Sequence, residues 1–125
     1  MTLVSIIGQR TRRGMQPSEV KIGPQVFSIE FRDPDKDGML NDGTQGYTLD
    51  AGNLIVVSKS LAPTKQRVTL MHEILHACRM TFENGMPDKG AKYDEWEHFF
   101  IGVYENALLM LINDNPELVE WFKDV

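Results

Sequence analysis

The sequence predicts one small α+β domain, with strands concentrated in its first half and helices in its second. Up to residue 62, short alternating apolar segments are separated by Gly, Asp and Asn, a pattern typical of strands and turns. From Pro63 onward, apolar residues recur with the spacing of an α-helix. A length of 125 residues suits a single domain, residues 1–125, with one modest hydrophobic core.

The strand predictions rest on alternation and on turn-forming residues. Residues 25–31 alternate apolar and polar side chains and are expected to form a half-buried strand. Residues 47–50 and Leu54–Ser58 flank Ala51-Gly52-Asn53, which predicts a hairpin with a three-residue turn. Residues 2–7 are expected to form a further strand near the start of the chain.

Three helices are predicted from periodicity and from the residues that start and stop helices. Pro63 suits the first turn of a helix that should run to about Glu83, where Asn84-Gly85 ends it. A second long helix is expected over residues 94–112. Asn115-Pro116 then predicts a short third helix, with Asn as its cap and Pro at its first position.

The first predicted helix contains His72-Glu73-Ile74-Leu75-His76. Two histidines four residues apart on a helix point the same way, so both imidazoles can reach one zinc ion, and Glu73 can act as general base to a zinc-bound water. Residues 69–78 carry no other charge and no Pro or Gly, which favours an unbroken helix. The alternative is two histidines satisfied by ordinary hydrogen bonds. The apolar arc opposite the histidines, expected to be buried, comprises Val68, Leu70, Met71, Ile74, Leu75, Ala77, Cys78 and Phe82.

A catalytic zinc site needs a third protein ligand, which the second long helix can supply. At about 100° per residue, Glu97 falls within the apolar arc of that helix, between Ile101 and Tyr104. A carboxylate on a core-facing stripe calls for a partner, and a metal is a suitable one. Glu97 is therefore the predicted third ligand, with His98 as the next candidate. A capping box formed by Asp94 and Glu97 is the structural alternative.

Residues 69–77 around the motif, Glu97 on the following helix and the preceding strand Leu54–Ser58 resemble a minimal zincin of the gluzincin type. The chain is similar to small phage-encoded and SprT-like metallopeptidases over about residues 46–123. The ending Asn115-Pro116-Glu117-Leu118 is also similar to small phage proteins of this kind. The longer HExxHxxGxxH pattern of the metzincins does not occur.

This resemblance implies a short mixed or antiparallel sheet packed on the active-site helix, with residues 46–125 as the catalytic core after a strand- and loop-rich part, residues 1–45. It implies Zn2+ held by three ligands and a metalloendopeptidase that acts through Glu73. The implied zinc ligands are His72, His76 and Glu97. A catalytically silent metal-binding structural or interaction protein with the same fold is the alternative function.

The resemblance also implies how a protein or peptide substrate would bind. Leu54–Ser58 is expected to be an edge strand to which an extended peptide adds through backbone hydrogen bonds. The candidates for an additional hydrogen-bond donor to the reacting carbonyl are Tyr93, Tyr104 and His98.

Composition argues against a nucleic-acid or membrane partner. The net charge is −5, and no cluster of Lys and Arg marks an anionic partner. No apolar run approaches the length of a membrane span, and residues 1–8 do not resemble a signal peptide. The single cysteine, Cys78, is expected to be a buried core residue in a reducing compartment. We therefore expect a cytoplasmic protein, in a bacterial host cell if it is phage-encoded.

The segment Asp33-Pro34-Asp35-Lys36-Asp37-Gly38 matches the first half of an EF-hand calcium loop. The twelfth position is Thr44 instead of glutamate, and no helix is predicted before the loop. A solvated acidic turn within a loop over residues 33–46 is the preferred interpretation, and weak calcium binding is the alternative.

Overall fold

The computed structural model of the protein describes residues 15–83 and 85–124 and confirms the α+β class. The predicted strand at residues 2–7 lies outside the described residues. The elements, in chain order, are β1 (Glu19–Ile22), β2 (Gln25–Arg32), the 3-10 helix η1 (Pro34–Lys36), α2 (Gly38–Asn41), β3 (Gly46–Leu49), β4 (Leu54–Ser58), α3 (Pro63–Phe82), α4 (Tyr93–Asp114) and α5 (Pro116–Lys123).

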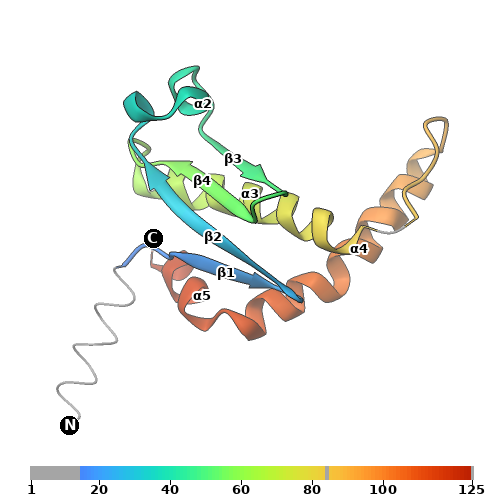
Figure 1. Ribbon diagram of the computed structural model, residues 1–125. Helices are drawn as coiled ribbons and strands as arrows, with labels where there is room; N and C mark the ends of the chain where they lie inside the picture. Colours follow the sequence, from blue (N-terminus) through green and yellow to red (C-terminus); the bar gives the residue numbers. More distant parts are fainter. Residues whose placement is uncertain (1–14, 84, 125) are drawn as a thin grey trace, which may run out of the picture.

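The four strands form one mixed sheet in the order β1-β2-β4-β3 (Figure 1). β2 and β4 run parallel, and each edge strand is antiparallel to its neighbour. The predicted alternation in β2 is confirmed, because Phe27 and Ile29 are buried while alternate residues are exposed. The predicted hairpin is β3–β4. In its turn the Asn53 N–H donates to the Asp50 carbonyl at 3.2 Å, and Asn53 has a φ of 48°.

The prediction that Leu54–Ser58 is an edge strand is wrong. β4 pairs with β2 on one side and with β3 on the other. Its central residues Ile55, Val56 and Val57 are fully buried. A continuous apolar run is typical of a strand that is covered on both faces, whereas an edge strand tends to alternate. The edge of the sheet that borders the HExxH motif is therefore β3, and β1 forms the opposite edge.

α3 lies along one face of the sheet and supplies more of the core than any other helix (Figure 1). It begins with Pro63 in its first turn, as predicted. The fully buried residues of its inner face are Leu70, Ile74, Ala77 and Cys78. Burying a Leu or Ile side chain contributes about 1.5–3 kcal/mol to stability. The burial of Cys78 agrees with expectation and raises the pKa of its thiol to about 11. Val68, expected in the buried arc, is instead 66% exposed.

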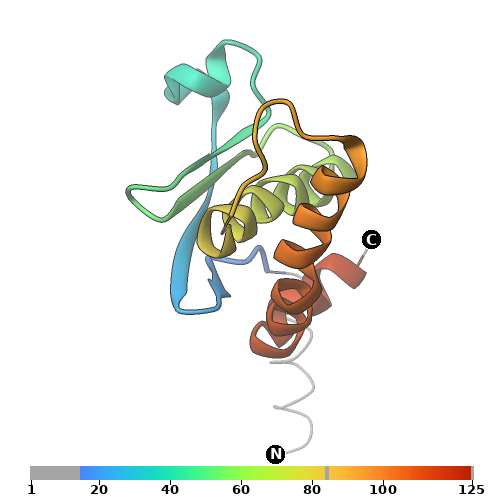
Figure 2. The ribbon, with the colours of Figure 1, turned by 90° about the vertical axis from the view of Figure 1, so that its right-hand side faces the viewer.

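α4 crosses α3 on the side away from β3 and β4 (Figure 2). The buried residues of α4 lie from its midpoint onward and are Val103, Ala107 and Leu111, of which Ala107 and Leu111 belong to the core cluster. The Tyr104 hydroxyl donates to the Leu75 carbonyl at 3.1 Å, which ties the two helices together. Among the described residues, no helix is long and apolar enough to cross a membrane.

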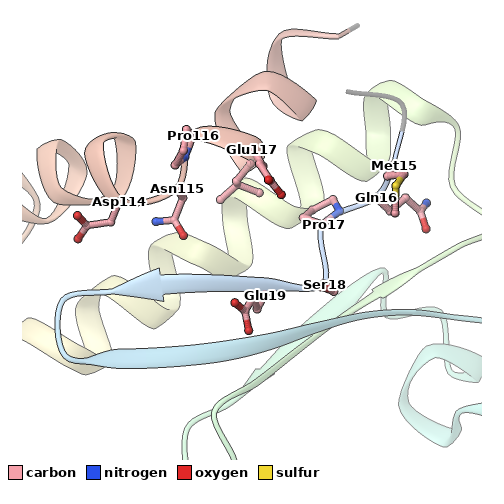
Figure 3. Close-up of a pocket in the computed structure, with 10 residues that line it drawn as sticks. Met15, Gln16, Pro17, Ser18, Glu19, Asp114, Asn115, Pro116 and Glu117 are labelled. Carbon is pink, nitrogen blue, oxygen red and sulfur yellow. The ribbon is translucent and has the colours of Figure 1, made fainter. Parts of the chain in front are cut away.

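α5 begins at Pro116 after Asn115, as predicted, but the Asn115 side chain does not cap its own helix. It accepts a hydrogen bond from the Lys21 N–H and donates one to the Lys21 carbonyl, both at 2.7 Å. This pairing closes part of the outer edge of β1, which would otherwise be open to other strands. Figure 3 shows Asn115 at the junction of α4 and α5. Residues 15–19 and 114–118 line a hollow there, with a volume of about 370 Å³. None of the predicted site residues lines this hollow.

Candidate active site

His72 and His76 lie one turn apart on the exposed side of α3, with their Nε2 atoms 3.1 Å apart. Two nitrogens bound to one tetrahedral zinc ion at 2.0–2.1 Å lie about 3.3 Å from each other. The two rings are nearly perpendicular, with centroids 4.8 Å apart. The pair therefore fits two corners of a tetrahedral zinc site.

Glu73 turns toward the sheet and is only 6% exposed. Its Oε1 accepts a hydrogen bond of 2.8 Å from the Thr48 hydroxyl, which also lies 3.2 Å from the Glu73 carbonyl oxygen. Its Oε2 is 4.0 Å from the Nε2 atom of His72. Thr48 thus fixes one carboxylate oxygen and leaves the other on the histidine side, where it can accept a proton.

The edge strand β3 approaches α3 this closely because Gly46 has no side chain. A Cβ atom at Gly46 would lie 2.8 Å from Thr69 Cγ2, 2.9 Å from the Val56 carbonyl oxygen and 3.5 Å from Glu73 Cγ. Beside this contact, between β3 and α3, is a hollow of about 300 Å³, which we call the β3 hollow. Its lining residues are Gln45, Gly46, Val68, Thr69, His72 and Glu73.

A charged network orders the chain before β3. Asp37 Oδ2 accepts hydrogen bonds from the Tyr47 hydroxyl at 2.7 Å and from the Arg32 guanidinium at 3.0 Å. Asp37 Oδ1 caps α2 by accepting from the N–H groups of Met39 and Leu40. These hydrogen bonds lower the pKa of Asp37 to about 2, and the bond from Tyr47 has the largest effect. The Asp37 side chain is therefore bonded to other parts of the fold, whereas the sequence predicts a solvated acidic turn at this segment.

Stability should depend on pH through Asp37. Its pKa in the folded protein, about 2, lies below the ordinary value of 3.8, so the carboxylate stabilises the fold above about pH 4 and loses this effect as the pH falls toward 2. We expect Asp37→Asn to lower the free energy of unfolding most at pH 6 and progressively less at pH 4 and pH 3, measured by urea denaturation. The exposed Asp35 provides the control Asp35→Asn, which should show little effect at any of these pH values. If Asp37→Asn lowered the free energy of unfolding by the same amount at all three pH values, the stabilisation would not come from the charge of Asp37.

The structure does not bring Glu97 to the histidine pair. The prediction that Glu97 faces the core is wrong, because Glu97 is exposed and accepts a hydrogen bond of 3.3 Å from the Tyr93 hydroxyl. α4 contacts α3 at Tyr104, which lies about 10 Å from Glu97 along the axis of α4. The first turns of α4, which carry Glu97, project beyond the sheet (Figure 1). Within residues 15–83 and 85–124, no three His, Cys, Asp or Glu side chains are grouped so that they could hold a metal ion.

The other candidates on α4 bond within or between helices. His98 is exposed, and its Nδ1 lies 2.8 Å from a backbone carbonyl one turn earlier. The Tyr93 hydroxyl bonds to Glu97 on its own helix, whereas the Tyr104 hydroxyl reaches α3 at the Leu75 carbonyl, next to His76. The capping bond at the start of α4 comes from Glu95, whose carboxylate accepts from the Lys92 N–H at 3.4 Å, and not from Glu97.

Two residues of the site were not anticipated from the sequence. Thr48 bonds to Glu73 across 25 positions of the chain, so no local pattern marks it. Gly46 carries a usable signal, because a glycine at the start of a strand indicates close approach of another element. Both belong to β3, which places that strand at the centre of the site.

The comparison with protein families confirms the resemblance to a small zincin that the sequence predicts. Residues 21–122 match the sequence model of Peptidase_M78, described as the IrrE N-terminal-like domain. The match extends the resemblance predicted for residues 46–123 back to include β2 and the last two residues of β1. No curated protein and no solved structure gave a significant match. Because the family model covers most of the 125 residues, including the HExxH helix, the chain belongs to the Peptidase_M78 family of zincin-like metallopeptidases.

Proposed function

We propose that the protein hydrolyses peptide bonds as a zinc-dependent metalloendopeptidase. The observation that carries this proposal is the arrangement of His72, Glu73 and His76. Two imidazole Nε2 atoms lie 3.1 Å apart, and a buried carboxylate lies 4.0 Å from one of them. A buried carboxylate between two metal-ligating histidines has a direct use in hydrolysis, whereas a purely structural zinc site does not need it.

In the proposed reaction, the histidines hold the metal, Glu73 transfers the proton and Thr48 orients Glu73. A zinc ion held by His72 and His76 would lower the pKa of its water to about 7 and so supply a nucleophile at neutral pH. Glu73 Oε2 accepts the proton of the attacking water and returns it to the leaving amine. Because the Thr48 hydroxyl holds Oε1, the carboxylate keeps one orientation through both transfers.

Glu97 remains our proposed third zinc ligand, with His98 as its alternative. Glu97 lies seven residues, close to two helical turns, before Tyr104 and therefore shares its angular position on α4. The Tyr104 hydroxyl reaches the backbone of α3 next to His76, which supports a ligand from this side of α4. The zinc affinities of Glu97→Gln and His98→Gln distinguish the two candidates.

The proposed substrate is a protein segment that pairs with β3 in an extended conformation. The Gln45 carbonyl accepts a hydrogen bond of 2.9 Å from the Ser58 N–H, so the backbone of Gln45 faces β4. Because alternate residues of a strand face opposite sides, the N–H and C=O groups of Gly46 and Thr48 face the open edge. An extended peptide that bonds to these groups would run along the β3 hollow, past Glu73.

The proposal is tested by zinc content and zinc-dependent hydrolysis. We expect the purified full chain to bind about one zinc ion and to cleave members of a mixed peptide library. Chelation should abolish the cleavage, and added zinc should restore it. Failure to bind zinc at neutral pH would overturn the proposal. Zinc binding without cleavage of any peptide would favour the catalytically silent metal-binding protein instead.

A further inference from the structure

A second hollow lies across α3 from the β3 hollow. Its volume is about 430 Å³, and we call it the Val68 hollow. Its lining residues are Arg67, Val68, Met71, His72, Leu75 and Phe122. Val68 and His72 also line the β3 hollow. The two hollows therefore adjoin across the ridge formed by these two side chains, and a peptide lying along β3 can place a side chain in each.

Three apolar side chains that line the Val68 hollow, those of Val68, Met71 and Leu75, are not part of the buried core. Val68 is 66% exposed, one turn before His72, although the neighbouring Thr69 is buried. Met71 and Leu75 are only partly buried. A single exposed apolar side chain is common on protein surfaces, but exposed and partly buried apolar side chains that together line a hollow beside a candidate zinc-binding histidine indicate contact with a ligand.

The far wall of the Val68 hollow is fixed in place and carries a positive charge. The Arg67 guanidinium donates to the backbone carbonyls of Trp121 at 3.0 Å, Asp124 at 3.0 Å and Pro63 at 3.1 Å, and it lies 4.2 Å from the centroid of the Trp121 ring. These bonds tie α5, and with it Phe122, to α3. They engage carbonyl oxygens, which carry no net charge, so the charge of Arg67 disfavours a Lys or Arg side chain in the hollow.

We propose that the Val68 hollow is a specificity pocket, which takes a large apolar side chain, Phe or Leu, of the substrate residue next to the scissile bond and excludes Lys and Arg. This inference rests on the proposed function, because it takes His72 and Glu73 as the centre of the reaction. Three observations indicate which side chain the Val68 hollow would bind. The lining is apolar, Arg67 carries a positive charge, and the hollow is continuous with the β3 hollow through His72.

Peptide binding to the full chain carrying Glu73→Gln, with one equivalent of zinc, tests the pocket without turnover. The peptides share one Ala- and Gly-based sequence and differ at a single central position, which is Phe, Leu, Ala or Lys. We expect Kd for the Phe and Leu peptides to be at least about tenfold lower than for the Ala and Lys peptides. The NMR signals of the methyl groups of Val68, Met71 and Leu75 should shift on binding.

A matched pair of surface variants links the preference to the pocket. Adding Val68→Glu should abolish the preference for Phe and Leu or turn it toward Lys. Adding Leu109→Glu, at a residue of α4 that is 67% exposed and does not line the hollow, should leave the preference unchanged. Equal affinity for all four peptides, or a preference that survives Val68→Glu, would overturn the inference.

Hydrolysis of the same four peptides by the unmodified chain separates this inference from the proposed function. If the Phe peptide binds with preference but is not cleaved, the pocket stands and the proposed hydrolysis fails. If all four peptides are cleaved with equal kcat/KM, the hydrolysis stands and the pocket fails.

Discussion

Replacing Glu73 with Gln should lower kcat for peptide hydrolysis by about 10²–10⁴-fold while the protein keeps its zinc. The amide of Gln cannot accept the proton of the attacking water at neutral pH. Its carbonyl oxygen can still accept the hydrogen bond from the Thr48 hydroxyl that Oε1 accepts now, so the local structure should persist. Steady-state kinetics and metal analysis of the same samples measure the two quantities.

The matched control is Glu105→Gln, which makes the same chemical change at an exposed position of α4. It should leave both activity and zinc content unchanged. If Glu73→Gln retained more than about a tenth of the activity, Glu73 would not be the general base. If it lost zinc as well as activity, the carboxylate would act on the metal site instead of on the proton.

The sequence was sufficient where a local pattern decides the structure. Pro63 and Asn115-Pro116 predict the starts of α3 and α5, because proline is suited only to the first turn of a helix. The alternation in residues 25–31 predicts β2, whose one face is buried. The spacing of His72 and His76 also fixes their mutual geometry, since residues four apart on any α-helix lie on one face.

The remaining features depend on how elements pack. Helical phasing gives the angular position of Glu97 correctly relative to Tyr104, but it contains no information on where along its axis α4 crosses α3. Whether Leu54–Ser58 is an edge strand depends on its neighbours, although its continuous apolar run was a signal for an interior position. The bond between Thr48 and Glu73 requires β3 and α3 to meet, which no single segment encodes.

Replacing Gly46 with Ala should lower the free energy of unfolding by about 1–3 kcal/mol and reduce activity in parallel. Gly46 is not among the glycines with positive φ, so the cost comes from contact and not from backbone conformation. The added Cβ would lie 2.8 Å from Thr69 Cγ2 and 2.9 Å from the Val56 carbonyl oxygen. These close contacts can be relieved only if β3 moves away from α3, and that movement would loosen the hydrogen bond between Thr48 and Glu73. Urea denaturation and kcat/KM measure the two effects.

A second substitution separates the two close contacts. Thr69→Ser removes the Cγ2 methyl but not the contact with the Val56 carbonyl, which belongs to the backbone of the neighbouring strand and cannot rotate away. The double variant Gly46→Ala with Thr69→Ser should therefore recover only part of the lost stability, and a double-mutant cycle measures how much. Gly52→Ala, at a hairpin glycine where an added Cβ has no heavy atom within 4 Å, should cost far less. If Gly46→Ala matched Gly52→Ala in both stability and activity, the close approach of β3 to α3 would not be what positions Glu73.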